Sequence, residues 1–500
     1  MIIETQKPVV DFLSSPNSFG GAPVQRIDTH LSHVFLVGAR AYKIKRAIRY
    51  DFADFSTLEK RKTACENEVR VNRRTAPGMY LGAIPVFRNE AGIGWKSSGE
   101  IVEWAVEMVR FEPGKQFDEM LARRELRDAD IEALADTIAR LHLHADEILS
   151  PQASNSVIKI IDQLTTSISN SGAAREEAVE RWSALARAKF DQYHSILDAR
   201  GRHGWVRHCH GDLHLANICM LKGAPTPFDA IEFNESLTEI DVLYDIAFLI
   251  MDFIHHNQNS LANLLLNRYL SATRDYAGLS LLPLFLSMRA AVRAMVLGLP
   301  AQSEKSHQAA SRYFDLALEF LIGENDPRLV AIGGYSGAGK STLARSLARE
   351  LDHHYGAVIL RSDVIRKRLA GVAPDEALDP EEYSDRQTAQ VYQRLFTDAR
   401  RALSAGQTVI ADATFLAEPV RRKIEEIAQQ TCVPFTGVWL TAPRDVLFGR
   451  VSSRSGDASD ATAEIVLQQI RQGAEAKGWR IIDASDSPST TLRRTLGLLS

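Results

Sequence analysis

The sequence predicts a chain of two domains that differ in fold class: an α+β domain with two lobes, then an α/β domain with a parallel sheet. Up to about residue 322, a short β-rich stretch precedes a long series of helical segments. Beyond the turn sequence GENDPR (323–328), short apolar runs alternate with helical segments. That alternation is typical of a parallel sheet with helices on both faces. We therefore expect domains 1–325 and 326–500, with the boundary in this turn.

The composition is that of a large globular protein. A chain of 500 residues is too long for one ordinary core, and 45% hydrophobic and 24% charged residues are typical of soluble proteins. The formal net charge of −4 weighs against a general nucleic-acid binder, whose affinity depends on a basic surface. The four cysteines form no disulfide framework, and we recognise neither a signal peptide nor a clean membrane span. We expect a cytoplasmic protein with no membrane partner.

The β-rich lobe begins with a predicted hairpin. The runs SHVFLVG and AYKIKRAI have strand character and flank Ala39-Arg40, which we interpret as the turn. The second run places Lys43 and Lys45 on one face, because alternate residues of a strand share a face. A helical segment with ENEVRVNRR follows, and residues 101–111 form another strand. Most of the sequence from 118 to 200 predicts helices.

A polar loop after these helices carries His210, Asp212 and Asn217 in the spacing H-G-D-x-x-x-x-N. This spacing is typical of a kinase catalytic loop, where the Asp orients or deprotonates the acceptor hydroxyl and the Asn binds Mg²⁺. Histidines and cysteines crowd the same loop, but no pair has the standard spacing of a zinc site.

The second domain opens with GYSGAGKS (334–341), which matches G-x-x-x-x-G-K-[ST] between an apolar strand and an amphipathic helix. Backbone N–H groups and the helix N-terminus would bind phosphate oxygens. Lys340 would reach the β- and γ-phosphates, and Ser341 would bind Mg²⁺. The predicted nucleotide-binding residues here are Gly334, Ser336, Gly337, Ala338, Gly339, Lys340, Ser341 and Thr342.

Further candidates of the second domain lie at strand and helix ends. Asp363 follows the second apolar run, where its carboxylate could meet an acceptor hydroxyl or simply cap a helix. Asp412 ends the strand TVIAD in a Walker-B-like position suited to Mg²⁺. Arg450 and Arg454 share one helical face and could close over the transferred phosphoryl group. The alternative for these two arginines is a solvated helix face.

The H-G-D form of the loop makes residues from about 25 to 322 resemble the aminoglycoside phosphotransferases, which have a protein-kinase-like fold. The resemblance implies that Lys43, or else Lys45, binds the ATP phosphates. It also implies an ion-pair partner on the next helix, where Glu68 fits the spacing better than Glu66.

The same resemblance implies a second Mg²⁺-binding carboxylate after the loop. The family usually has Ile-Asp-Trp/Phe where this chain has Ile231-Glu232-Phe233. A glutamate is still a hard oxygen ligand, so Glu232 joins Asn217 as a predicted metal ligand. Asp245 matches an aspartate that supports the catalytic loop in the family.

Residues 328–500 resemble the small P-loop kinases of the gluconate kinase, polynucleotide 5′-kinase and zeta-toxin type. The resemblance rests on GGYSGAGKST, RSDVIRK, VIADATF and the arginines before DASDAT. It implies a P-loop NTPase fold, and the placement Asp363-x-x-Arg366 indicates a kinase within it.

We therefore expect a bifunctional kinase that uses ATP and Mg²⁺ to phosphorylate hydroxyl groups of small molecules at one or both sites. The acceptor could be a sugar, an aminoglycoside-like or a nucleoside-like compound. Two alternatives remain open. The first domain could be a pseudokinase-like sensor that regulates the second, which the departure at Glu232 motivates. The second domain could instead phosphorylate 5′-hydroxyls of nucleic acid, against which the net charge weighs.

Overall fold

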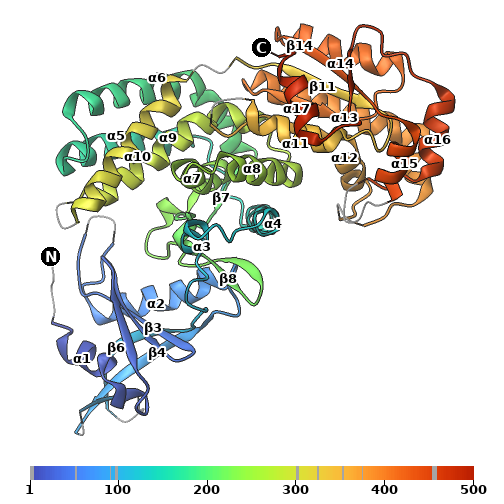
Figure 1. The fold of residues 1–500 in the computed structure, drawn as a ribbon. Helices are drawn as coiled ribbons and strands as arrows, with labels where there is room; N and C mark the ends of the chain where they lie inside the picture. The colour runs from blue at the N-terminus through green and yellow to red at the C-terminus, as the bar shows by residue number, and fades with distance from the viewer. Residues whose placement is uncertain are drawn as a thin grey trace. The chain divides into compact units, whose positions relative to one another are not determined.

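The computed structural model describes residues 5–50, 53–90, 92–95, 99–299, 303–323, 326–351, 354–373, 376–452 and 459–499 (Figure 1). The chain divides into two compact units, Met1–Val157 with His194–Asp252, and Ile158–Tyr193 with Phe253–Ser500. Each unit combines segments from distant parts of the chain, and the domain limits 1–325 and 326–500 expected from the sequence remain a prediction.

The first unit contains an antiparallel sheet of six strands in the order β1-β2-β3-β6-β4-β5. The strands are β1 (Val24–Asp28), β2 (Ser32–Val37), β3 (Arg40–Lys45), β4 (Tyr80–Asn89), β5 (Gly92–Gly94) and β6 (Glu100–Val109). The β2–β3 hairpin turns at Gly38-Ala39, one residue earlier than expected.

Helices cover both faces of this sheet. On one face, Cys65 and Val69 of α2 (Leu58–Asn72) share a buried cluster with Val106 of β6. On the other, Leu13 of α1 (Lys7–Ser14) packs into a cluster with Ala105. The alternation of neighbouring residues between the two faces is the ordinary geometry of a strand.

Short elements present the polar loops of the first unit. They include α3 (Phe117–Ala122), α4 (Asp128–His144), β7 (Val206–His208), η2 (Leu215–Asn217), β8 (Ile218–Leu221), β9 (Ala224–Pro227), β10 (Glu239–Asp241) and most of α7 (Val242–His255). β7 pairs with β10 and β8 pairs with β9, both antiparallel. The segments 209–217 and 228–233 lie between these pairs.

The second unit begins with helices. They are most of α5 (Ser154–Ser171) and α6 (Glu176–Arg202), then α8 (Asn259–Thr273), α9 (Leu282–Leu297) and α10 (Glu304–Ile322). Trp182 of α6 donates its indole N–H to Ser287 Oγ at 2.9 Å, and Ser287 donates to Ala317 O at 2.6 Å. These bonds join three helices through groups that are buried.

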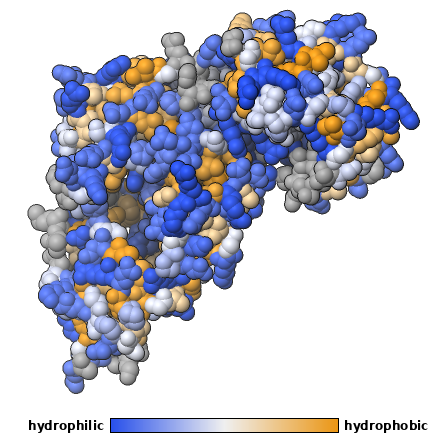
Figure 2. Space-filling view, in the orientation of Figure 1, coloured by the Kyte–Doolittle hydropathy of each residue, from blue (hydrophilic) through white to orange (hydrophobic). Residues whose placement is uncertain are grey.

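The segment Ala277–Leu297 is long and apolar enough to cross a membrane, but 72% of its most apolar window is buried inside the protein. A core helix passes the same test, so the segment is weak evidence for a membrane span. On the face shown in Figure 2, hydrophobic residues form small patches that are separated by hydrophilic ones.

The second unit continues into a five-stranded parallel sheet in the order β12-β13-β11-β14-β15. The strands are β11 (Leu329–Gly334), β12 (Val358–Arg361), β13 (Val409–Asp412), β14 (Phe435–Thr441) and β15 (Arg480–Asp483). The helices are α11 (Lys340–Glu350), α12 (Ser362–Leu369), α13 (Asp385–Ser404), α14 (Glu418–Gln430), α15 (Arg444–Ser452), α16 (Ala463–Gln472) and α17 (Pro488–Leu496). All five apolar runs that the sequence offered as strands are confirmed.

Candidate active sites

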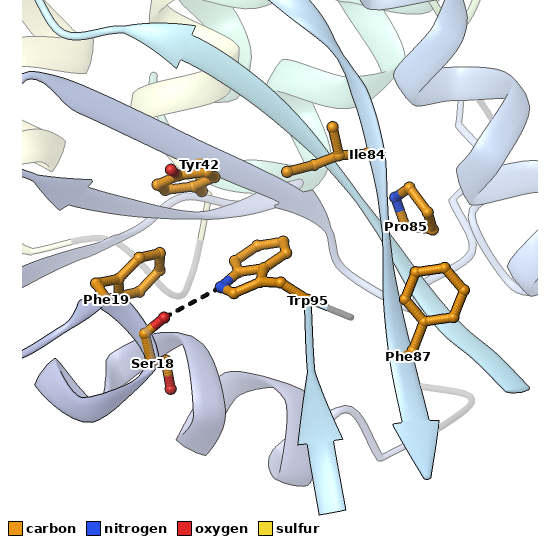
Figure 3. Close-up of a pocket in the computed structure, with 7 residues that line it drawn as sticks. All are labelled: Ser18, Phe19, Tyr42, Ile84, Pro85, Phe87 and Trp95. Atoms are coloured by element: carbon orange, nitrogen blue, oxygen red, sulfur yellow. Dashed lines mark hydrogen bonds between the residues drawn. The ribbon is translucent and has the colours of Figure 1, made fainter. Parts of the chain in front are cut away.

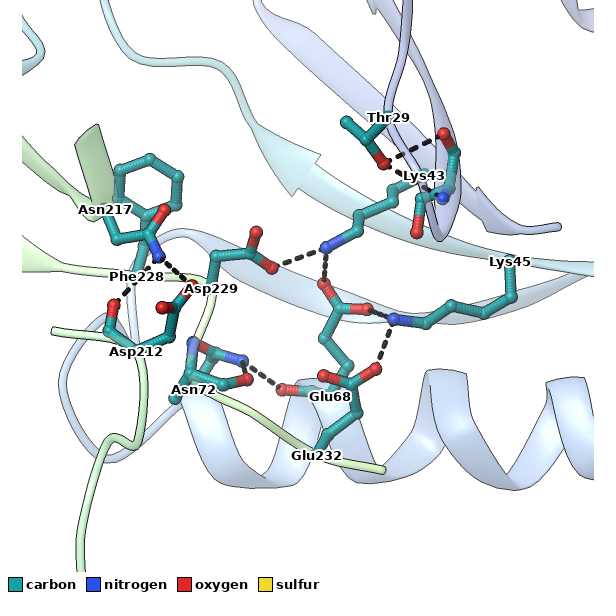
Figure 4. A network of polar contacts seen from close by, with 12 residues as sticks. Thr29, Lys43, Lys45, Glu68, Asn72, Asp212, Asn217, Phe228, Asp229 and Glu232 are labelled. Carbon is teal, nitrogen blue, oxygen red and sulfur yellow. Dashed lines mark hydrogen bonds and ion pairs between the residues drawn. The ribbon is translucent and has the colours of Figure 1, made fainter. Parts of the chain in front are cut away.

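A buried network of lysines and carboxylates links three distant parts of the first unit (Figure 4). Lys43 Nζ lies 2.9 Å from Glu68 Oε1 and also contacts Asp229 Oδ1. Lys45 Nζ lies 2.6 Å from Glu68 Oε2 and pairs with Glu232. Glu68 therefore bridges both lysines, as expected for the ion-pair partner on the helix after the hairpin.

Local structure places Glu68 in this network. Helix α2 begins after Thr57, whose side chain accepts from the N–H of Lys60 at 3.3 Å. The helix buries its Cys65 and Val69 face against the sheet. Glu68 lies on the buried side of the helix as well, with no exposed surface. Its neighbour Glu66 is half exposed and turns to Lys62 instead.

The electrostatics of the network follow from burial opposed by charge pairing. Burial works to lower the pKa of Lys43, but Asp229, Glu68 and Glu232 outweigh it and raise that pKa well above its usual value. Burial works to raise the pKa of Glu68, but the two lysines outweigh it and lower the pKa to about 2. For Glu232, burial prevails over Lys45 and raises the pKa.

The catalytic-loop residues lie on the other side of Asp229. Asn217 Nδ2 donates to both the backbone O and Oδ2 of Asp212, at 2.9 Å each. Figure 4 shows Asp212, Asn217 and Asp229 together, whereas Glu232 points away from them toward Lys45. The structure thus brings Asp212 and Asn217 together as expected but does not bring Glu232 to them.

Asp229 is a candidate site residue that sequence reasoning missed. It has a positive φ of 60°, which is uncommon for a residue other than glycine. Its N–H donates to Tyr80 Oη at 3.0 Å, and its side chain is 41% exposed, against 3% for Glu232. An exposed carboxylate beside Asn217 has the oxygen chemistry that Mg²⁺ prefers, so the donor set of this site fits the metal. Glu232 fits it less well, because it is almost fully buried and points away from Asn217 toward Lys45.

Asp245 supports the H-G-D loop through hydrogen bonds to its backbone, as the resemblance implied. Its carboxylate accepts from the N–H groups of His210 at 3.0 Å and Gly211 at 2.9 Å. It also lies 3.1 Å from His142 Nε2. Ligand atoms of His142, Cys209 and Asp245 lie within 4.8 Å of one another, but Asp245 already accepts the loop N–H groups. We therefore assign the cluster to loop support rather than to metal binding.

The P-loop forms the second site. Gly337 and Gly339 have positive φ values of 84° and 91°, and α11 begins directly after them at Lys340. A Cβ on Gly337 would lie 2.6 Å from Leu447 O, so only glycine fits there. Lys340 Nζ donates to Tyr335 O at 3.0 Å, which places the ammonium inside the loop. The Ser336 N–H donates to Gln469 Oε1 at 2.9 Å.

The predicted Mg²⁺ residues of the P-loop site are brought together by Arg361 at the end of β12. Arg361 Nη2 donates to Ser341 Oγ at 3.1 Å, and its Nε lies 3.3 Å from Asp412 Oδ2. The Ser341 hydroxyl and the Asp412 carboxylate both contact one guanidinium, so they lie close together. Both are oxygen donors of the kind that Mg²⁺ prefers, and these residues therefore fit the metal.

Asp363 lies in the first turn of α12, two residues after Arg361. Burial raises its pKa, and the nearby charge of Asp412 raises it further, although Arg361 and Lys340 act in the opposite direction. A carboxylate with a raised pKa beside the P-loop lysine is suited to accept a proton. Helix capping, the alternative reading of Asp363, does not account for the raised pKa.

The two predicted arginines have different outcomes. Arg450 donates from Nη2 to Ala484 O at 2.7 Å, and a Cβ on Gly339 would lie 3.8 Å from its Nη1. Its guanidinium therefore lies at the P-loop. Arg454 lies outside the described residues.

A pocket of about 400 Å³ lies in the first unit, apart from the lysine network (Figure 3). It is lined by Ser18, Phe19, Tyr42, Ile84, Pro85, Phe87 and Trp95. Tyr42 and Lys43 are neighbours on β3, so the pocket lies on the sheet face opposite the lysine network. Among the described residues, its lining carries no charged group to bind phosphate.

Two family models match the chain. Residues 55–282 match the "Phosphotransferase enzyme family", and residues 329–476 match a family described as "AAA domain". The matched regions contain the H-G-D loop and the P-loop respectively. They confirm the predicted fold class, a kinase-like α+β domain followed by a P-loop domain with a parallel sheet.

Similar proteins cover both the whole chain and its parts. The protein Rv2004c of Mycobacterium tuberculosis is 30% identical over 460 residues, which cover 90% of each chain. An adenylyl-sulfate kinase of Myxococcus xanthus is 30% identical over 129 residues, 26% of this chain and 65% of that protein. A choline kinase structure from Cryptosporidium parvum has 11% identity and a TM-score of 0.40, covering 61% of this chain and 90% of that one.

Proposed function

The chain belongs to the same family as the mycobacterial protein Rv2004c and is a phosphotransferase with two kinase-type domains, and from this premise we propose that both domains transfer phosphate from ATP. The observation that carries the proposal is that both sites combine the same kinds of groups. Each one combines a phosphate-binding lysine, oxygen donors suited to Mg²⁺ and a separate aspartate for the acceptor.

In the first site, Lys43 binds ATP phosphates while Glu68 positions its ammonium. Asn217 and Asp229 supply oxygens for Mg²⁺, which neutralises phosphate charge when bound. Asp212 orients the acceptor hydroxyl and takes its proton as the new P–O bond forms and the bond to ADP breaks. Asp229 supports an active site over the pseudokinase alternative, because that alternative was motivated by Glu232 alone.

In the second site, the P-loop and Lys340 bind the phosphates, and Ser341 with Asp412 supplies the metal donors. Asp363 takes the proton of a second acceptor hydroxyl, and Arg450 neutralises charge on the transferred group. Positioning and charge neutralisation supply the catalysis in both sites, without a covalent intermediate.

We propose small-molecule hydroxyl compounds as the acceptors, in line with the resemblance to small-molecule kinases. A polynucleotide 5′-hydroxyl remains the second candidate for the P-loop site, and the net charge of −4 weighs against it. We also propose a location in the cytoplasm, where the four free cysteines would stay reduced.

The test is an ATP-consumption screen against sugars, aminoglycosides, nucleosides and 5′-hydroxyl oligonucleotides. It compares the unmodified protein with Asp212→Ala and Lys340→Ala. A third variant, Lys477→Ala, serves as control because that side chain is 87% exposed. We expect each active-site variant to abolish turnover with one class of acceptor and leave the other class unaffected. Turnover in a variant that carries both Asp212→Ala and Lys340→Ala would contradict the proposal.

A further inference from the structure

Helix α8 lies in the phosphotransferase-family region but packs onto the P-loop domain. The family match at 55–282 includes it, whereas the compact unit that contains it is Phe253–Ser500 with Ile158–Tyr193. Within that unit, α8 contacts α11 and β12. The P-loop domain is therefore completed by a helix that the sequence assigns to the preceding domain.

β12 is the edge strand that needs this helix. It pairs with β13 on one side, where Val358 donates its N–H to Thr408 O at 2.9 Å. Successive peptide groups of a strand point in opposite directions, so the N–H of Ile359 points outward from the sheet. An outward N–H at a sheet edge lacks a strand partner, and leaving it without one in a buried place is costly.

Asn267 and Asn263 of α8 supply the missing partners. Asn267 Oδ1 accepts from the N–H of Ile359 at 2.7 Å, and its Nδ2 donates to Ala357 O at 3.0 Å. One side-chain amide thus replaces the peptide group of an absent sixth strand. Asn263 is 2% exposed, and its Nδ2 donates to Tyr355 O at 2.7 Å and to Ala357 O at 3.0 Å.

The turn before β12 lies directly against this helix. Gly356 has a positive φ of 72°, and a Cβ there would lie 2.6 Å from Asn263 Nδ2 and 2.3 Å from Ala348 O. A side chain at 356 would therefore displace either the asparagine or the end of α11. Gly356 thus has α8 on one side and α11 on the other, with no room for a side chain. The packing of α8 against this turn is therefore tight.

The strand that α8 contacts ends in the P-loop active site. Arg361, two residues beyond Ile359, contacts Ser341 and Asp412. Asp363, the proposed proton acceptor, follows in the next turn. A strand rises about 3.3 Å per residue. The backbone N–H that Asn267 bonds, at Ile359, therefore lies only two strand residues from Arg361.

We propose that Asn263 and Asn267 are positioning residues for the P-loop site, acting through β12 on Arg361 and Asp363. This rests on the proposed phosphotransfer at that site. The bonds determine where β12 lies relative to the P-loop, whose own residues come from β11 and α11. Losing them shifts the acceptor aspartate and leaves the nucleotide cradle in place.

The experiment uses the full chain with Asn267→Leu, and with Asn259→Leu as the matched control at the start of the same helix. Two readouts are needed: amide hydrogen exchange of segment 357–363, and kcat with KM for ATP of the Lys340-dependent turnover. We expect exchange at least about tenfold faster and kcat at least about tenfold lower, with KM for ATP within about twofold. The control should match the unmodified protein.

Unchanged exchange, or faster exchange with unchanged kcat, would overturn the positioning role. If the Leu variant does not fold, Asn267→Ala leaves room for a water at Ile359, and it should show the same pattern more weakly. If the unmodified protein has no Lys340-dependent turnover, the proposed function fails. Exchange of 357–363 then decides by itself whether α8 holds the strand.

Discussion

The two lysines proposed to bind ATP phosphates are held in contrasting ways. Lys43 is buried among carboxylates that come from residues 68 and 229, far along the chain. Lys340 donates to the backbone of Tyr335, within the same short loop. The first site is thus assembled by the tertiary fold, whereas the P-loop is a local structure of one continuous segment. Substitutions in the lysine network of the first site should disturb stability and activity together. Substitutions in the P-loop should disturb activity alone.

The largest expected effect is at Asp363, the proposed proton acceptor of the P-loop site. Asp363→Asn should lower Lys340-dependent turnover about 10³-fold, because an amide cannot accept the proton. The pKa of Asp363 is raised, so its carboxylate is lost by protonation at a higher pH than for an ordinary aspartate. Turnover should therefore fall as pH falls through that raised pKa, which a pH–rate profile measures. A profile identical in both proteins would remove Asp363 from the reaction.

Glu68 tests the claim that the first site is part of the tertiary structure. Glu68→Gln should lower the free energy of unfolding by about 3 kcal/mol, since two buried lysines lose their shared partner. Urea unfolding followed at the first unit measures it, and Glu66→Gln on the same helix is the control. The pKa of Glu68 is lowered to about 2, so its contribution is complete above its usual pKa and is lost as pH falls toward 2. A stable Glu68→Gln protein would show that the network is not structural.

A third prediction distinguishes the roles of Asp229 and Glu232. Asp229→Asn should lower Asp212-dependent turnover about 10²-fold and raise the Mg²⁺ concentration required, because it removes a metal ligand. Glu232→Gln should cost less than about tenfold and leave the Mg²⁺ requirement unchanged, since the residue pairs with Lys45. A Mg²⁺ titration of turnover distinguishes them. The reverse order would restore Glu232 as the metal ligand.

The smallest effect is expected at Arg450. Arg450→Lys keeps the charge but loses the guanidinium geometry next to Gly339, so kcat at the P-loop site should fall about tenfold with KM for ATP nearly unchanged. Arg444→Lys on the same helix is exposed and serves as control. Steady-state kinetics of both variants provide the measurement, and equal losses would assign the effect to α15 as a whole.

The contrast also explains which features the sequence could predict. The P-loop strands, Lys340 and Ser341 follow from a local motif with a strand before it and a helix after it. The pairing of Lys43 with Glu68 was implied by the resemblance to the aminoglycoside phosphotransferases, whose spacing favours Glu68 over Glu66. Asp229 was missed because PFDAIEF offers two carboxylates, and the choice depends on a positive φ at Asp229 that no local pattern reveals.

Long-range packing is the other part that the sequence pattern did not show. Asn263 and Asn267 lie in a helix whose apolar residues predict only a core position. Their partners, Tyr355, Ala357 and Ile359, come about ninety residues later, and a side-chain amide bonded to a strand edge leaves no periodic signal. These contacts join α8, which precedes the turn at 323–328, to α11 and β12 of the P-loop domain that follows it.

The central claim is that one chain carries two separate ATP sites, and binding stoichiometry tests it without knowledge of either acceptor. Calorimetric titration of the full chain with Mg²⁺ and a non-hydrolysable ATP analogue should give two equivalents per chain. Lys43→Met and Lys340→Met should each give one equivalent, with the remaining affinity unchanged. A single equivalent in the unmodified protein, or loss of all binding on either substitution, would contradict the account.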